Sequence, residues 1–128
     1  MKKIMSVGQC NPDHFALSNF LKSNFHCEIL RIDSTEEALE RMNKEKFDLV
    51  LVNRKLDIDY TDGTILIEKM KSSSGMKNIP VMLVSNYPEY QEDAVKMGAF
   101  YGIGKMEYSN PSILERFQGI LERVSTVL

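Results

Sequence analysis

Residues 47–53 read Phe-Asp-Leu-Val-Leu-Val-Asn, and this short segment is the strongest guide to the architecture of the chain. Residues 49–52 are apolar without interruption, whereas a strand with one face in water would alternate apolar and polar residues. We therefore expect a central strand of a parallel sheet that is covered by helices on both faces. The run stops at Asn53, which places a polar amide at the carboxyl end of that strand.

Short apolar segments alternate with amphipathic segments along the rest of the chain. Further strands are expected at residues 4–7, 27–32, 81–84 and 100–103, and a helix is expected after each of the strands. Strand–helix pairs of this kind connect into a parallel sheet through right-handed crossovers. The predicted fold class is therefore α/β: a three-layer flavodoxin-like (βα)5 parallel sheet with strand order 2-1-3-4-5.

Local capping signals indicate where several of these helices begin. Asn11 is expected to cap the first helix, with Pro12 at its first position. Ser34 begins a capping box, in which its side chain bonds a backbone amide and Glu37 reaches back. Asn110 precedes a proline in the same way and predicts the start of the last helix.

Apolar residues at helical spacing predict the buried side of each helix. The fourth helix is expected over about residues 89–97 and ends before Gly98, because glycine readily adopts the left-handed conformation that ends helices. The apolar residues behind these predictions are Ala16, Leu17, Phe20 and Leu21 in the first helix, Ala38, Leu39 and Met42 in the second, Ile65, Leu66, Ile67 and Met70 in the third, and Ile113, Leu114, Phe117, Ile120, Leu121 and Val124 in the last.

The composition is that of one soluble globular domain, residues 1–128. The formal net charge of −2 gives no field that would favour nucleic acid or an anionic membrane surface. No apolar run approaches the roughly 20 residues of a membrane span, and the first apolar segment breaks at Gly8, too early for a signal peptide. We therefore expect a cytoplasmic protein in which Cys10 and Cys27 are free thiols.

In a sheet of this order, the functional site lies outside the carboxyl ends of the strands, beside the first and third strands. The residues that follow the strands at that edge are Gly8-Gln9, Asn53-Arg54, Ser85-Asn86 and Lys105. We expect these residues around a single crevice, so their side chains indicate what chemistry the protein can perform.

Five features, in order along the chain, resemble the response-regulator receiver domain of two-component signalling. The apolar strand ending at Asn53 resembles the strand that ends in the phosphate-accepting aspartate of that family. The other features with counterparts in the family are Asp62-Gly63, residues 78–85 with the hydroxyl residue Ser85, Ala94 followed by Gly98-Ala99, and Lys105. The resemblance covers essentially the whole chain and implies a signal-transduction domain of the CheY-like, phosphorelay type.

The resemblance implies that active members hold Mg²⁺ with an acidic pair and the acceptor aspartate, whose carboxylate is then phosphorylated. This chain has Gly8 and Gln9 at the acidic-pair positions and Asn53 at the acceptor position. An amide nitrogen is not nucleophilic, and the amide carries no charge to hold a divalent cation. Ser85 and Lys105 keep the switch and lysine positions, and neither suffices alone. We therefore expect a degenerate site with no catalytic residues, no metal ligands, no cofactor and no Mg²⁺ binding.

The segment from Asn53 to Gly63 is two residues longer than the usual family pattern and contains Asp57 and Asp59. Either carboxylate could be a relocated phosphate acceptor, or both could belong to a solvated acidic loop. The acidic-loop interpretation is favoured, because a loop carboxylate lacks the fixed in-line position that phosphoryl transfer needs.

Aromatic residues are concentrated in the last third of the chain. Gly102 occupies the position of the family's aromatic switch residue, directly after Tyr101, and Met106 stands where the family usually has proline. In the family, the fourth helix, fifth strand and fifth helix form the usual partner surface, and interface cores are enriched in aromatic residues and methionine. The candidate interaction surface therefore consists of Tyr87, Tyr90, Tyr101, Met106 and Tyr108.

Three functions are open at this point. The favoured hypothesis is a pseudo-receiver that binds a protein partner without phosphorylation, such as a signalling protein or a second copy of itself, and binds neither nucleic acid nor membrane. The first alternative is an active phosphorelay receiver that uses Asp57 or Asp59 as acceptor. The weaker alternative is a flavodoxin-like domain that binds a small ligand.

Overall fold

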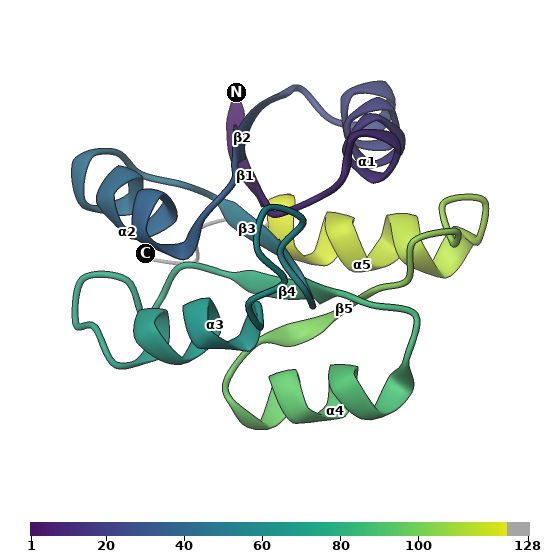
Figure 1. Ribbon diagram of the computed structural model, residues 1–128. Helices are drawn as coiled ribbons and strands as arrows, with labels where there is room; N and C mark the ends of the chain where they lie inside the picture. The colour runs from purple at the N-terminus through teal and green to yellow at the C-terminus, as the bar shows by residue number, and fades with distance from the viewer. Residues whose placement is uncertain (123–128) are drawn as a thin grey trace.

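The computed structural model describes residues 1–122, which form a five-stranded parallel sheet with helices on both faces (Figure 1). The strand order is β2-β1-β3-β4-β5, so the predicted topology is confirmed. In chain order the elements are β1 (Lys2–Val7), α1 (Asn11–Asn24), β2 (Cys27–Ile32), α2 (Thr35–Lys44), β3 (Leu49–Asn53), α3 (Thr64–Lys71), β4 (Val81–Val84), α4 (Pro88–Lys96), β5 (Phe100–Ile103) and α5 (Pro111–Leu121).

Strand β3 is buried along its whole length because it contributes side chains to both cores of the domain. Val50 and Val52 point into the core beneath α2, α3 and α4, whereas Leu49 and Leu51 point into the core beneath α1 and α5. The same division of the helices is visible in Figure 1. Helical cover on both faces is the physical reason for the unbroken apolar run.

The sheet is regular except between its last two strands. Met82 pairs with Phe100 and Val84 pairs with Ile103, so β5 contains one more residue than β4 between these two pairs. This β-bulge lies at Tyr101 and Gly102. A bulge leaves backbone groups without ladder partners and can re-aim a side chain, so the hydrogen bonds at this position require a separate account.

The helix caps agree with prediction at two of three positions. Ser34 Oγ accepts a hydrogen bond from the Glu37 amide at 3.2 Å, and Asn110 Oδ1 accepts one from the Ser112 amide at 3.0 Å. The prediction for Asn11 was wrong, because Cys10 is the N-cap residue and Asn11 is already the first residue of α1. Proline fits either early position, since the first amides of a helix have no intrahelical acceptor.

Two of the residues that were predicted on the buried faces of helices are not buried. Ala16 and Ile65 are exposed, so neither belongs to its helix's buried face. The predicted Val124 lies outside the described residues. α4 begins at Pro88, one residue earlier than expected, and Gly98 follows it with a φ of +109°, as a terminating glycine should.

Cys10 and Cys27 are free, as predicted, and the structure shows that both are partly buried. None of the helices within residues 1–122 combines the length and the apolar character that crossing a membrane requires.

Candidate functional site

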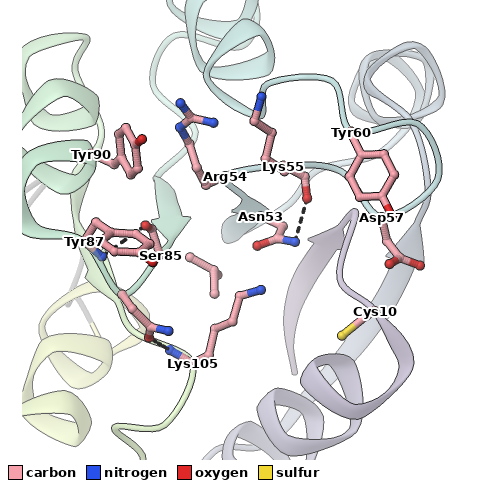
Figure 2. A pocket seen from close by; sticks show the side chains of 12 residues that line it. Cys10, Asn53, Arg54, Lys55, Asp57, Tyr60, Ser85, Tyr87, Tyr90 and Lys105 are labelled. Carbon is pink, nitrogen blue, oxygen red and sulfur yellow. Dashed lines mark hydrogen bonds between the residues drawn. The ribbon is translucent and has the colours of Figure 1, made fainter.

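A pocket of about 520 Å³ opens at the carboxyl ends of the strands (Figure 2). The structure brings Asn53, Arg54, Ser85, Asn86 and Lys105 together around it, whereas Gly8 and Gln9 are buried and do not line it. The remaining lining residues are Cys10, Lys55, Asp57, Tyr60, Val84, Tyr87 and Tyr90. The pocket therefore combines strand ends with residues from the long loop after β3.

Asn53 uses its amide nitrogen to connect two backbone segments. Nδ2 donates to the carbonyl oxygen of Lys55 at 2.7 Å and to that of Gly8 at 3.3 Å. Figure 2 shows the bond to Lys55, with the amide oxygen on the opposite side, toward the pocket. A carboxylate has no hydrogen to donate to either carbonyl. Asn53 therefore connects two backbone segments through donated hydrogen bonds, which an ionised aspartate could not make.

The end of β1 is closed by Leu56 from the long loop. Gly8 has a φ of +73°, which favours glycine, and a Cβ atom at this residue would lie 3.0 Å from Leu56 Cα and overlap its side chain. Leu56 is fully buried, and Gly8 also accepts a hydrogen bond from the Asp57 amide at 2.9 Å. The longer loop thus packs an apolar side chain against the first acidic-pair position.

Gln9, at the second acidic-pair position, is turned into the protein. Its side chain is 2% exposed, and Nε2 donates to the Val7 carbonyl at a long 3.4 Å. Its own carbonyl accepts from Arg31 Nη2 at 3.1 Å. Gln9 therefore does not present a polar group to the pocket.

The residues present do not fit the Mg²⁺ site that the family resemblance implies. Mg²⁺ is held in proteins mainly by carboxylate oxygens in a strict octahedral arrangement. Here the Gly8 carbonyl already accepts two hydrogen bonds, and Asn53 offers one neutral oxygen. Within residues 1–122, no group of three or more His, Cys, Asp and Glu side chains is placed to hold a metal ion. The expected loss of Mg²⁺ binding stays a prediction.

Lys105 forms an ion pair with a carboxylate on α1, a contact that the sequence did not predict. Its Nζ lies 3.0 Å from Asp13 Oδ2, in the first turn of α1. Its backbone amide donates to Asn86 Oδ1 at 2.7 Å. At this position the Asp13 carboxylate also interacts favourably with the helix dipole. The ion pair connects α1 to the loop after β5.

One wall of the pocket is a cluster of two tyrosines and an arginine, which we call the aromatic ledge (Tyr87, Tyr90 and Arg54). The Arg54 guanidinium lies 4.1 Å from the Tyr90 ring centroid, and Tyr87 meets Tyr90 edge to face at 5.7 Å. Arg54 also forms an ion pair with Asp62 at 3.4 Å, and Asp62 does not line the pocket. The ledge is therefore held in place by its own contacts.

The two loop carboxylates are both exposed. Asp59 Oδ1 accepts hydrogen bonds from the side chain and the backbone amide of Thr61, and these bonds lower the pKa of Asp59. Asp57 lies at the rim of the pocket, and its carboxylate is directed away from Asn53 (Figure 2). Neither carboxylate occupies the strand end at which Asn53 lies.

The candidate interaction surface does not form a single face. Tyr87 and Tyr90 line the pocket, whereas Tyr101 lies at the sheet edge beside Arg116, whose guanidinium is 5.2 Å from its ring. Tyr108 packs on Phe20 of α1 with 5.1 Å between ring centroids. Burial, with a smaller effect of Asp13, raises the pKa of Tyr108 to about 12. Met106 is 88% exposed in the loop before α5.

Gln91 is the residue that sequence reasoning missed. It is 2% exposed, and its Nε2 donates to Leu83 O at 2.9 Å, Ser85 O at 3.2 Å and Ile103 O at 3.3 Å. Its Oε1 accepts from the Gly102 amide at 2.8 Å. Gln91 thereby bonds backbone groups of β4 and β5 on both sides of the bulge. A signal was present, because Gln91 precedes buried Ala94 by three positions and so shares its helix face.

Gly102 is required by the close approach of this side chain and the neighbouring strand. A Cβ atom on Gly102 would overlap the Leu83 carbonyl oxygen and lie 2.9 Å from Gln91 Oε1. On the α5 side, Arg116 Nη1 donates to the Gly102 carbonyl. Gln91 of α4 and Arg116 of α5 therefore both bond to the backbone of Gly102. By the family resemblance, this is the position of the aromatic switch residue.

The comparisons with known proteins agree with this architecture. Residues 13–118 match the family model of the response regulator receiver domain. A protein of the response-regulator type from Chloroflexus aurantiacus J-10-fl is 21% identical, with a TM-score of 0.81 over 95% of this chain and 98% of that chain. The receiver domain of NtrX from Brucella abortus is also 21% identical, with a TM-score of 0.79 over 94% of this chain and 99% of that one.

A third similar structure is the receiver domain of the sensor histidine kinase PA1611 from Pseudomonas aeruginosa PAO1, which has a magnesium ion coordinated in its active-site cleft. It is 14% identical, with a TM-score of 0.68 over 92% of this chain and 98% of that chain. No curated protein matches the sequence. Because the family model spans most of the chain, the protein belongs to the response regulator receiver domain family.

Proposed function

We propose that this protein is a pseudo-receiver, a receiver domain that binds a protein partner without being phosphorylated. The observation that carries the proposal is the hydrogen bonding of Asn53. Its amide nitrogen donates to Gly8 O and Lys55 O. The side chain at the phosphate-acceptor position therefore connects two backbone segments of the crevice. The packing of Leu56 against Gly8 supports the same conclusion, since it leaves no room for a carboxylate there.

The partner surface that the structure favours is the edge formed by α4, β5 and α5. Tyr101 is 44% exposed and Met106 is 88% exposed there. Beside them lies a hollow of about 410 Å³, whose walls include Pro88, Tyr101 and Arg116. Aromatic residues, methionine and arginine are enriched at interface cores. The proposed partner is a signalling protein or a second copy of this chain, in the cytoplasm.

The chemical half of the proposal is tested by intact mass after incubation with acetyl phosphate and Mg²⁺. Wild-type protein is expected to gain no phosphate. The variant carrying Gln9→Asp and Asn53→Asp is the comparison, and Gly8 is left unchanged because a side chain there would collide with Leu56. A phosphate on the wild type would contradict the proposal, and Asp57→Asn and Asp59→Asn would then show which carboxylate accepts it.

The interaction half is tested by placing a photo-crosslinking residue at Tyr101 or at Met106 in cells. The control position is Glu36, which is exposed on α2, on the other side of the sheet from α5. A partner is expected to be captured from the two surface positions and not from position 36. Equal capture from all three positions would show that this edge is not the partner surface.

A further inference from the structure

We propose that the 520 Å³ pocket binds a nucleotide, with its planar base on the aromatic ledge and its phosphate toward Lys105 and Ser85. This goes beyond a protein-binding role, because it assigns a ligand to the crevice whose phosphorylation chemistry is missing. It would give the domain a chemical input other than covalent phosphate.

The position and size of the pocket suit such a ligand. In open parallel α/β sheets, ligands bind outside the carboxyl ends of the strands, where the chain order reverses. Small-molecule pockets have volumes of roughly 300–1,000 Å³ and combine apolar walls with a few polar groups. This pocket, about 520 Å³, lies at that edge and combines tyrosine rings with Asn53, Ser85 and Lys105.

The charges on the wall favour an anion. Three cationic residues line the pocket, against one carboxylate: Arg54, Lys55 and Lys105, against Asp57. The acidic partners of Arg54 and Lys105 are Asp62 and Asp13, and neither is a lining residue. Lys55 is exposed and makes no ion pair among the described residues. Cationic residues therefore outnumber acidic residues in the lining of the pocket.

The aromatic ledge supplies an exposed Tyr87 ring, which is held edge to face against Tyr90. Tyr90 is partly buried against the core and carries the Arg54 guanidinium on its ring, while Tyr87 is 58% exposed at the mouth. Bases stack on aromatic rings and on arginine planes. A preformed surface lowers the entropy lost on binding, so a planar ring is the ligand group that this wall fits best.

A third tyrosine ring, that of Tyr60, lies across the mouth from the ledge. Tyr60 is 74% exposed and has a φ of +59°, the only positive value for a residue other than glycine within residues 1–122. Such a conformation is uncommon for a bulky residue and is concentrated at functional sites. In Figure 2 the Tyr60 ring and the Tyr87 ring lie on opposite sides of the pocket.

The inner end of the pocket offers the groups that bind a phosphate. Figure 2 shows the Lys105 ammonium directed toward Asn53. Ser85 Oγ accepts from the Tyr87 amide at 3.2 Å, which leaves its hydrogen available to donate. Charge-assisted hydrogen bonds to phosphate oxygens are among the stronger ones in proteins. A nucleotide uses this end and the ledge together, whereas inorganic phosphate or a nucleoside uses only one of them.

Isothermal titration calorimetry at low ionic strength tests the site with AMP, GMP and UMP, and with adenosine, guanosine and inorganic phosphate as partial ligands. At least one nucleotide is expected to bind more tightly than its nucleoside and than phosphate. Added salt should weaken nucleotide binding, because salt screens exposed charges. Absence of heat from every nucleotide at millimolar concentration, or equal binding of nucleotide and nucleoside, would overturn the proposal.

Two pairs of variants locate the site. Tyr87→Ala should weaken nucleotide binding about fivefold or more, since a stacked base contributes at least about that factor. Its matched control is Tyr101→Ala, an exposed tyrosine outside the pocket. Lys55→Gln should weaken binding by about threefold, against Lys44→Gln as the exposed control on α2. Wild-type affinity in both pocket variants would overturn this location. Because binding is measured without any protein partner, this outcome is independent of the proposed partner surface.

Discussion

The crevice beside β1 and β3 can be compared with the bulge between β4 and β5. In each place a buried side-chain amide bonds to backbone. Asn53 donates to two carbonyl groups, whereas Gln91 donates to three carbonyl groups and accepts from the Gly102 amide. The comparison shows that the same functional group can connect two backbone segments at the strand ends or bond the backbone around a bulge.

The difference has a physical cause in the surrounding backbone. At the bulge, Leu83 O and Gly102 N bond to the buried Gln91 side chain, and buried backbone groups must be paired. At the crevice, the backbone lies at the ends of strands, where water can reach it. We therefore expect substitutions at the bulge to lower the free energy of unfolding more than substitutions at the crevice. The following variants test that ranking.

The largest effect is expected from Gly102→Ala. The new Cβ would overlap the Leu83 carbonyl, a backbone atom inside the sheet that cannot rotate away. The free energy of unfolding should fall by about 4 kcal/mol. Urea denaturation followed by circular dichroism measures it, a method that suits a chain without tryptophan. The control is Gly119→Ala on α5, where a Cβ meets nothing within 4 Å; a gain of about 0.5 kcal/mol is expected there.

Gly8→Ala tests the crevice in the same way and should cost about 3 kcal/mol. The cost has two sources, the φ of +73° and the collision with Leu56. It is smaller than at Gly102 because part of the collision involves a side chain that can move. Gly75→Ala is the control, since its Cβ would have only Ser73 Oγ nearby, at 4.0 Å. If Gly8→Ala proves more damaging than Gly102→Ala, our ranking of the two regions is wrong.

Gln91→Ala should destabilise the domain by about 2 kcal/mol, because it leaves a buried donor and several acceptors unpaired. Gln9→Ala is a close comparison, since both side chains are 2% exposed but Gln9 makes one long bond of 3.4 Å. Thermal denaturation should show a clearly lower midpoint for Gln91→Ala. Amide hydrogen exchange at Gly102 should also become faster in that variant. Equal midpoints and unchanged exchange would mean that the Gln91 bonds add little.

The smallest effect is expected from Asn53→Asp, at about 1 kcal/mol. The substitution removes the two donated hydrogens and places a carboxylate beside the carbonyl groups of Gly8 and Lys55. Asn86→Asp is the control in the same pocket, because Asn86 uses its oxygen as an acceptor for the Lys105 amide and aspartate keeps that bond. Equal stability of the two variants would argue against the structural role of the Asn53 nitrogen.

Much of the fold was predictable because it depends on local patterns. The unbroken run at residues 49–52 indicated a strand covered on both faces, and the alternation of strands and helices left few topologies. Ser34 and Asn110 were recognised as caps because a cap depends only on residues a few positions away. Asn11 was misplaced by one position, since proline is acceptable at more than one early position of a helix.

The candidate site was predictable at the strand ends and not beyond them. The sequence by itself determined that Asn53, Ser85 and Lys105 would meet, since the carboxyl ends of parallel strands lie at one edge. Only the tertiary structure decided that Lys105 pairs with Asp13, that Leu56 covers Gly8 and that Gln91 bonds to Gly102 in the bulge. These contacts join residues that are distant or out of register along the chain. They depend on how a loop length and a one-residue bulge are accommodated in three dimensions, which local spacing does not encode.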